Sequence, residues 1–276
     1  MSAATVQVQP FRPVERRVTP AGLLRSEWIK FWSVRSVVIT MLASVVATVG
    51  LGVLFSLAAR SALSSGGAAA AEAGVDPFTF SMMGAQFASL VVAAVGVILI
   101  AGEFSTGMIR TSFAAAPGRV GVLLAKAVVL AVNVLVLQGV AVLVAFLLGQ
   151  AVLDTRGFGI SLGDDHVLRA LAGTVLTLVG VSLVGLAVGA LLRNPAGAIV
   201  TVVAALFIVP NLLGLIPDSW GGEEINKFFL TNSVMNLGSL DPVPGYLDNG
   251  PGVAVFALWV VGLGALAALA LRTRDV

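Results

Sequence analysis

Six apolar stretches, each close to the length of a bilayer-spanning helix, dominate the sequence. They cover residues 36–57, 80–101, 122–149, 168–192, 196–216 and 253–271. A helix needs about 20 mostly apolar residues to cross the hydrocarbon core. Only 11% of the 276 residues are charged, whereas soluble domains carry about 25%, so this chain cannot cover a water-facing surface. We therefore expect an all-α membrane protein with six transmembrane helices.

Lysine and arginine fall mainly on one side of the predicted spans. With the N-terminus inside, 12 of the 16 basic residues lie on the inner side, and 10 of the 14 acidic residues lie outside. Basic residues concentrate on the cytoplasmic side of membrane proteins. We therefore predict a multi-pass protein of a bacterial plasma membrane with both termini in the cytoplasm. The bacterial assignment follows from the excess of arginine, alanine, valine and glycine, which is typical of GC-rich genomes.

The segment before the first apolar run is polar and then amphipathic. Residues 1–19 form a basic, proline-containing stretch that we expect to be a cytoplasmic tail. Thr19 followed by proline is typical of a helix start, which predicts a helix over 20–35. The apolar side chains that share one face of this helix are Leu24, Trp28, Phe31 and Trp32. Basic residues with two tryptophans indicate an interfacial amphipathic helix. The alternative, the inner end of the first span, is disfavoured because Lys30 and Arg35 interrupt the apolar run.

The other connections, of which 58–79 and 217–251 are outside and 193–195 is inside, differ in character. Residues 58–79 are rich in alanine, serine and glycine and are expected to form a flexible loop. The turn at 193–195 is short, so the fourth and fifth spans should form a tight hairpin. Residues 217–251 are long and partly apolar, which predicts one or two short helices dipping back against the outer face, as a re-entrant segment does. Pro210-Asn211 should break the fifth span near its outer end, either as a hinge or as the point where the helix stops.

The connection between the second and third runs is short and charged. It carries Glu103, Arg110 and Arg119, and its middle, residues 106–115, is predicted to form a short helix. Pro117-Gly118 should end that helix, because proline lacks a backbone donor and glycine accepts unusual dihedral angles. A short helix held between two spans lies at the membrane surface, where a partner protein can push it.

A few polar and small residues lie inside the apolar runs. Asn133 and Gln138 in the third run, and Asn211 near the outer end of the fifth, are candidates for lining a translocation path. Hydrogen bonding between helices, worth on the order of 1 kcal/mol, is the favoured explanation for Asn133 and Gln138. Gly185 and Gly189, with Gly180, make a small-residue face that indicates close helix packing.

Several kinds of chemistry are disfavoured by the residues present. The chain has no cysteine, which excludes disulfides and iron–sulfur clusters. The single histidine, His166, follows Asp164-Asp165, but a metal site needs more ligands, so a solvated acidic loop is expected and no metal site. No Ser/His/Asp set indicates catalysis, and no phosphate-binding loop is present. An enzyme is therefore not expected, and neither is a nucleic-acid partner.

The charged loop and the topology together resemble the type-2 ABC exporter permeases. The loop residues that match that family are Glu103, Gly107, Arg110, Phe113, Pro117 and Arg119, with the later lysine at Lys126. The segment 24–32 resembles the interfacial helix of the family. Six spans with both ends inside, and a long semi-apolar last outer segment, complete the resemblance.

The resemblance implies a transmembrane subunit of an ATP-driven exporter. Its partners would be a separate ATP-binding subunit, which would carry ATP and magnesium, a second permease copy or paralogue, and membrane lipids. The chain itself would hold no cofactor. The loop helix would couple to the ATP-binding subunit. An alternative from another class is a membrane-embedded structural or accessory protein that transports nothing.

Three of the matching positions leave alternatives open. Glu103 could anchor the loop helix by pairing with Arg110 or Arg119, or it could contact the ATP-binding subunit. A third possibility is that it is an ordinary interfacial carboxylate in water. Arg119 and Lys126 are equally explained as topology anchors and as contacts to lipid phosphates. Nothing in the residues indicates the substrate.

Overall fold

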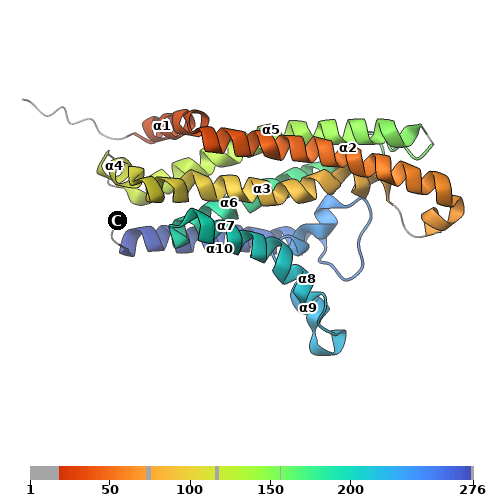
Figure 1. The fold of residues 1–276 in the computed structure, drawn as a ribbon. Helices are drawn as coiled ribbons and strands as arrows, with labels where there is room; N and C mark the ends of the chain where they lie inside the picture. Colours follow the sequence, from red (N-terminus) through yellow and green to blue (C-terminus); the bar gives the residue numbers. More distant parts are fainter. Residues whose placement is uncertain (1–18, 73–75, 116–117, 156, 275–276) are drawn as a thin grey trace, which may run out of the picture.

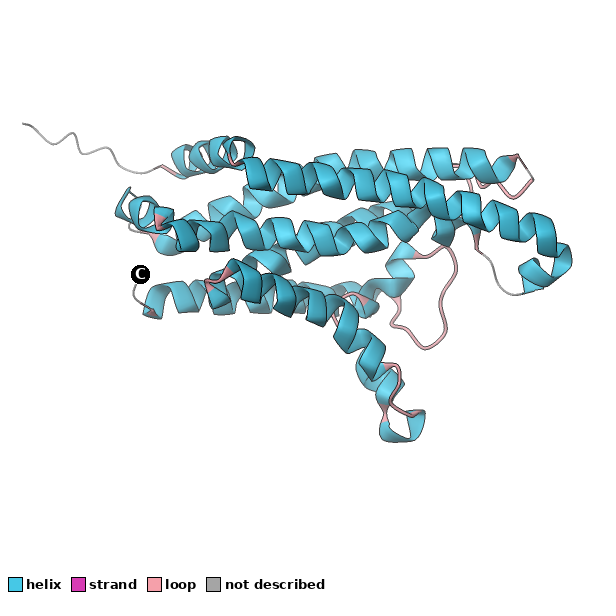
Figure 2. Ribbon diagram, in the orientation of Figure 1, coloured by secondary structure: helices cyan, strands magenta, loops and turns pink. Residues whose placement is uncertain are grey.

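A computed structural model of the chain shows a bundle of long helices lying side by side (Figures 1 and 2). It describes residues 19–72, 76–115, 118–155 and 157–274, and within these ranges no residue is in a strand. Six helices are long and apolar enough to span a membrane, which confirms that prediction for the described ranges. They are α2 (Arg35–Glu72), α3 (Pro77–Thr106), α5 (Arg119–Asp154), α6 (Val167–Leu192), the segment Pro195–Leu213, and α10 (Asn249–Thr273).

A separate short helix, α1 (Pro20–Ser33), precedes the first spanning helix. The Thr19 hydroxyl accepts a hydrogen bond from the Gly22 amide at 3.2 Å, so the predicted helix start is present. Val34 is extended and divides α1 from α2, which confirms two helices in place of one continuous span. The predicted tail lies outside the described residues, apart from Thr19.

The loop between α3 and α5 contains α4 (Met108–Ala115). The predicted helix over 106–115 starts two residues later than expected, because Gly107 ends α3 with a φ of 75°. Glycine adopts this left-handed conformation at little cost, since it has no Cβ. Gly118 precedes α5, and Pro117 lies outside the described residues.

Most basic residues of the described ranges gather at one end of the bundle. This basic end comprises α1, α4, the start of α2 and α5, and the last turns of α6 and α10 (Figure 1). Its basic residues are Arg25, Lys30, Arg35, Arg110, Arg119, Lys126, Arg193, Arg272 and Arg274. The grouping agrees with the charge asymmetry read from the sequence.

The centre of the bundle is the contact between α3 and α6. Within an apolar stretch of 18 residues, 61% of the residues in α3 and 67% in α6 are buried, against 17% in each of the last two spans. A Cβ added to Gly96 would lie 2.0 Å from the Ser182 carbonyl oxygen, and one at Gly185 would lie 2.1 Å from that of Ala93. The two backbones are therefore in direct contact, as small residues at membrane helix interfaces allow. Gly180 faces Phe256 of α10 instead.

The connections at 58–79 and 193–195 differ in how well the local sequence predicts them. The prediction of a flexible loop over 58–79 is wrong for most of its length, since α2 continues to Glu72 and α3 begins at Pro77. Alanine-rich sequence has a high helix propensity, which the serine and glycine content concealed. The tight hairpin is confirmed, because α6 ends at Leu192 and Asn194 caps the next helix through the Gly197 amide.

The fifth span consists of α7 (Pro195–Val203), a π-helical stretch at Ala204–Ile208 and α8 (Val209–Leu213). The helix does not stop at Pro210-Asn211, since α8 continues to Leu213, so that alternative is wrong, while the hinge stays a prediction. Proline cannot donate to the preceding turn, and the wide π-helical turn before it accommodates this loss. Figure 1 shows α8 and α9 (Gly222–Asn226) diverging from the bundle.

The segment before α10 has two different parts. Its first part contains the short 3₁₀ helix η2 (Asp218–Trp220) and α9, and it leads away from the bundle (Figure 1). Its second part, the 3₁₀ helix η3 (Asn232–Gly238), packs on α6 and α10 and buries Val234. The predicted short helices are present, but only η3 packs back against the bundle.

Candidate functional site

Four charged side chains meet inside the basic end of the bundle, and we call them the charge network. Its members are Glu27, Lys30, Glu103 and Lys126. The first two are one turn apart on α1, Glu103 is in the last turn of α3, and Lys126 is about two turns into α5. The network therefore joins three helices that are distant in sequence.

Lys126 is the centre of this network. Its Nζ lies 2.6 Å from Glu27 Oε2 and 2.6 Å from Glu103 Oε1. The Lys126 side chain is fully buried, and Glu27 is 2% exposed. Buried charges are costly unless they are paired, and here two cations face two carboxylates, so the formal charges balance. Removal of one member would leave an uncompensated charge inside the bundle.

Lys30 extends the network to the loop helix. Its Nζ donates to Glu27 Oε1 at 2.9 Å, to Glu103 Oε1 at 3.2 Å and to Ser112 Oγ of α4 at 2.9 Å. These three bonds use all the protons of the ammonium group. Burial lowers the pKa of Lys30, but the hydrogen bonds and charges of Glu27 and Glu103 outweigh it and raise the pKa above 10.5. Lys30 therefore stays charged across the physiological range, with its contribution to stability lost only at alkaline pH above that value.

One acceptor of the network is left over. Glu103 Oε2 is buried and accepts no hydrogen bond from the described residues. A buried carboxylate oxygen without a donor is uncommon in proteins. The network can therefore accept one further donor without losing any bond that it already makes.

The residues of α4 divide between the bundle and the surface. Ile109 is 2% exposed and anchors the helix, as does Ser112 through Lys30. Arg110 is exposed. The Phe113 ring is half-buried, with the Arg119 guanidinium 5.6 Å from its centre. One side of α4 is thus attached to the bundle while Arg110 remains available to a partner.

Arg119 also has a structural contact that the sequence did not indicate. It donates to the carbonyl oxygens of Leu271 and Arg274, at 3.1 and 3.2 Å, near the end of α10. Cations at a helix C-terminus satisfy carbonyls that lack an intrahelical donor. Arg274 in turn donates to the Leu191 carbonyl of α6. These contacts tie the first residue of α5 to the end of α10, and the end of α10 to that of α6.

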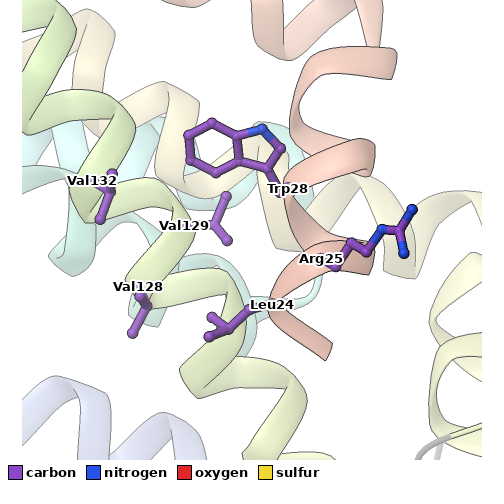
Figure 3. Close-up of a pocket in the computed structure, with 6 residues that line it drawn as sticks. All are labelled: Leu24, Arg25, Trp28, Val128, Val129 and Val132. Carbon is purple, nitrogen blue, oxygen red and sulfur yellow. The ribbon is translucent and has the colours of Figure 1, made fainter. Parts of the chain in front are cut away.

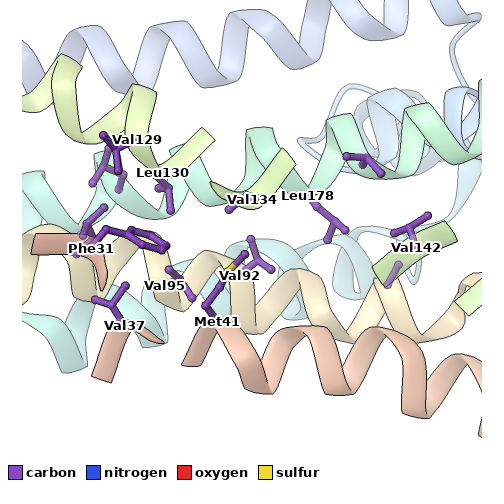
Figure 4. Close-up of a cluster of buried hydrophobic side chains, with 14 of the residues drawn as sticks. Phe31, Val37, Met41, Val92, Val95, Val129, Leu130, Val134, Val142 and Leu178 are labelled. Carbon is purple, nitrogen blue, oxygen red and sulfur yellow. The ribbon is translucent and has the colours of Figure 1, made fainter. Parts of the chain in front are cut away.

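The α1 face differs from the predicted one. Phe31 is fully buried among core residues that include Val37, Val95 and Val129 (Figure 4). The three other members of the predicted face are exposed, by 37% to 46%. They are Leu24, Trp28 and Trp32. Because Phe31 lies at the edge of the apolar stripe, beside Glu27 on the helix surface, it turns inward with the charge network.

The expected partners of Glu103 are corrected by the structure. Glu103 pairs with Lys30 and Lys126, and it forms no ion pair with Arg110 or Arg119 in the described residues. It is also buried, so the alternative of a carboxylate in water is wrong. The sequence did contain a signal for this network, because a lysine inside an apolar run needs an acidic partner.

The candidate path residues make different contacts. Gln138 is fully buried on α5, where it donates to Ser44 Oγ at 2.7 Å and accepts from Thr48 Oγ1 at 2.8 Å, both on α2. Asn133 is also buried and donates to the Val129 carbonyl of its own helix. Asn211 is exposed and donates to the Phe207 carbonyl. Gln138 thus bonds two helices together, as the favoured explanation requires.

Replacement of Gln138 by leucine is expected to lower the free energy of unfolding by about 1 kcal/mol, the cost of an interhelical hydrogen bond. Ser44 and Thr48 keep their bonds to α2 carbonyls, so no polar group is left without a partner. Thermal unfolding in detergent measures the change. Val136→Ala, at an exposed position of the same helix, is the control. Equal stability of Gln138→Leu and wild type would contradict a bonding role.

The acidic loop before α6 is held by local hydrogen bonds. Asp164 accepts from the Ser161 amide at 2.9 Å and from its hydroxyl at 2.8 Å. The bond from the amide, with that from the hydroxyl, holds the pKa of Asp164 below its usual value. His166, directly before α6, has a left-handed backbone conformation with a φ of 67°. Across the described ranges, no group of three or more His, Cys, Asp or Glu side chains could hold a metal ion.

Comparison with known proteins does not assign a family. No protein-family model and no curated protein matches this chain. The geometry of the basic end is therefore the basis on which a function can be inferred.

Proposed function

We propose that this chain is the transmembrane subunit of an ATP-driven exporter in a bacterial plasma membrane, and that α4 couples it to a separate ATP-binding subunit. The observation that carries the proposal is the attachment of α4 to the charge network through Ser112 and Lys30. A short helix between two candidate spans is thereby bonded to α1, α3 and α5 together. The resemblance of residues 103–119 to the loop of type-2 ABC permeases supports the same function.

In this proposal, closure of the ATP-binding subunits on ATP displaces α4. The displacement passes to Lys30 and then to Glu103 and Lys126, because separating these buried charges would cost several kcal/mol. The inner ends of α1, α3 and α5 then move as one unit, and a central path changes between inward and outward access. Glu103 Oε2, which accepts no hydrogen bond within the described part of the chain, can accept a new one in the displaced arrangement.

A second permease copy or a paralogue is part of the proposal. Within an apolar stretch of 18 residues, only 17% of the residues of the fifth span and 17% of those of α10 are buried within one chain. Exposed side chains on this side include Phe207, Leu212, Leu258 and Leu266. A partner permease would cover part of this surface, and lipid would cover the remainder. With two permeases in the complex, each of two ATP-binding subunits would act on one loop helix.

Charge reversal at Arg110 tests the coupling. We expect Arg110→Glu to weaken co-purification with the cognate ATP-binding subunit about tenfold or more, since an interfacial charge mismatch costs several kcal/mol. The measurement is the yield of ATP-binding subunit retained on tagged permease when the two are co-expressed. Arg60→Glu, a reversal at the other end of α2, is the matched control and should retain wild-type yield.

The same experiment can reject the exporter. If wild-type permease retains none of the candidate ATP-binding subunits, the chain is better explained as a structural or accessory membrane protein. If Arg110→Glu and Arg60→Glu retain equal amounts, the ATPase binds elsewhere and α4 is not the coupling element.

A further inference from the structure

A shallow groove of about 300 Å³ lies between α1 and α5, on the outer surface of the basic end (Figure 3). Its lining residues are Leu24, Arg25, Trp28, Val128, Val129 and Val132. Val129 is 3% exposed and lies at the floor, while Val128 and Val132 are 49% and 41% exposed. The groove is therefore an apolar surface on a candidate spanning helix, bordered by a helix that bears tryptophan and arginine.

Arg25 is the only charged residue of this lining, and it is exposed. Figure 3 shows its guanidinium extending away from the valines, whereas the Trp28 ring lies over the valine side. No described residue forms an ion pair with Arg25. The nearest acid of α1, Glu27, is buried and bonded to Lys30 and Lys126. A cation beside an apolar floor, without an acidic partner, calls for an anion that is joined to an apolar chain.

We propose that this groove binds one anionic phospholipid, with an acyl chain along Val128 and Val132 and the phosphate at Arg25. Tryptophan is favoured at the level of lipid headgroups, because its ring is apolar and its N–H is polar, which fits Trp28 between these two parts. Basic groups near the ends of membrane helices attract anionic headgroups. A free anion would leave the apolar floor uncovered, and an apolar peptide would leave Arg25 without a counter-charge.

The proposal does not depend on the exporter function, since it requires only that α5 spans a membrane. The groove is close to the charge network, because Trp28 and Glu27 are adjacent on α1. Trp28 is exposed at the groove, whereas Glu27 is buried in the network. A lipid bound on one side of α1 and the network on the other would hold this helix against α5.

Native mass spectrometry of the full chain in detergent tests the site. Phosphatidylglycerol and phosphatidylcholine with identical acyl chains are titrated separately. We expect phosphatidylglycerol to bind about fivefold more tightly, which is the effect of one basic residue near an anionic headgroup. Arg25→Gln should remove this preference, and Trp28→Ala should weaken both lipids. Arg272→Gln, at another exposed arginine of the basic end, should leave the preference unchanged.

Three results would overturn the proposal. Equal affinity of the two lipids for wild type would show that charge is not recognised. An unchanged preference in Arg25→Gln would place the anion elsewhere. Equal loss of preference in Arg25→Gln and Arg272→Gln would show diffuse attraction in place of a site. Thermal unfolding of each variant separates these results from misfolding, and neither arginine is buried.

Discussion

Lys126→Met is expected to lower the free energy of unfolding by about 3–5 kcal/mol, the cost of breaking a buried ion pair by removing one partner. Methionine keeps the length and apolar character of the lysine stem, so packing changes little. What is lost is the ammonium group 2.6 Å from both Glu27 and Glu103, inside a bundle where Lys126 itself has no exposed surface. Thermal unfolding of the purified protein in detergent measures the effect.

Two further variants show whether the loss comes from charge. Adding Glu103→Gln to Lys126→Met leaves Glu27 facing Lys30, so the double variant should be more stable than Lys126→Met alone. Lys227→Met removes a lysine whose partner, Glu224, is 73% exposed, and should cost at most about 1 kcal/mol. The charge network would have no part in stability if Lys126→Met and Lys227→Met unfolded at the same temperature.

Gly185→Ala is expected to lower the free energy of unfolding by about 1–3 kcal/mol, the usual cost of overpacking. The new Cβ would lie 2.1 Å from the Ala93 carbonyl oxygen, and this neighbour is backbone, which cannot turn aside as a side chain does. The α3–α6 contact would have to open along its length. The measurement is again thermal unfolding in detergent, and loss of folded protein on expression would be the extreme form of the same result.

Gly139→Ala is the matched control on α5. A Cβ there meets no heavy atom within 4 Å, so the substitution should be neutral or stabilising by about 0.5–1 kcal/mol, as expected when alanine replaces glycine inside a helix. Gly185→Ala should thus lower the free energy of unfolding, whereas Gly139→Ala should not. A similar change at both positions would mean that α3 and α6 are not in backbone contact.

Local sequence predicted the helices well where one signal dominated. Runs of apolar residues placed the spans, Thr19 marked a helix start, and the short turn at 193–195 predicted a tight hairpin, all of which the structure contains. The errors came where two local signals competed. Alanine prevailed over serine and glycine in the first outer connection, and a π-helical stretch allowed the fifth span to pass Pro210.

The candidate site was predicted only in part, for a physical reason. A lysine within an apolar run requires an acidic partner, but helical periodicity says nothing of which distant helix supplies it. For an ion pair with Glu103, local sequence offers Arg110 and Arg119 as the nearest candidates. In the fold, Arg119 bonds carbonyls at the end of α10, and α1 brings Glu27 to Lys126 and Lys30 to Glu103.

The sequence by itself determined that the chain has six candidate spans, a basic side, and a short charged helix between the second and third spans. These properties depend on hydrophobicity and charge along one segment at a time. Only the tertiary structure decided that Glu27, Lys30, Glu103 and Lys126 meet, that α3 and α6 touch through glycines, and that a groove opens between α1 and α5. Such contacts depend on how helices distant in the chain pack together, which no single segment specifies.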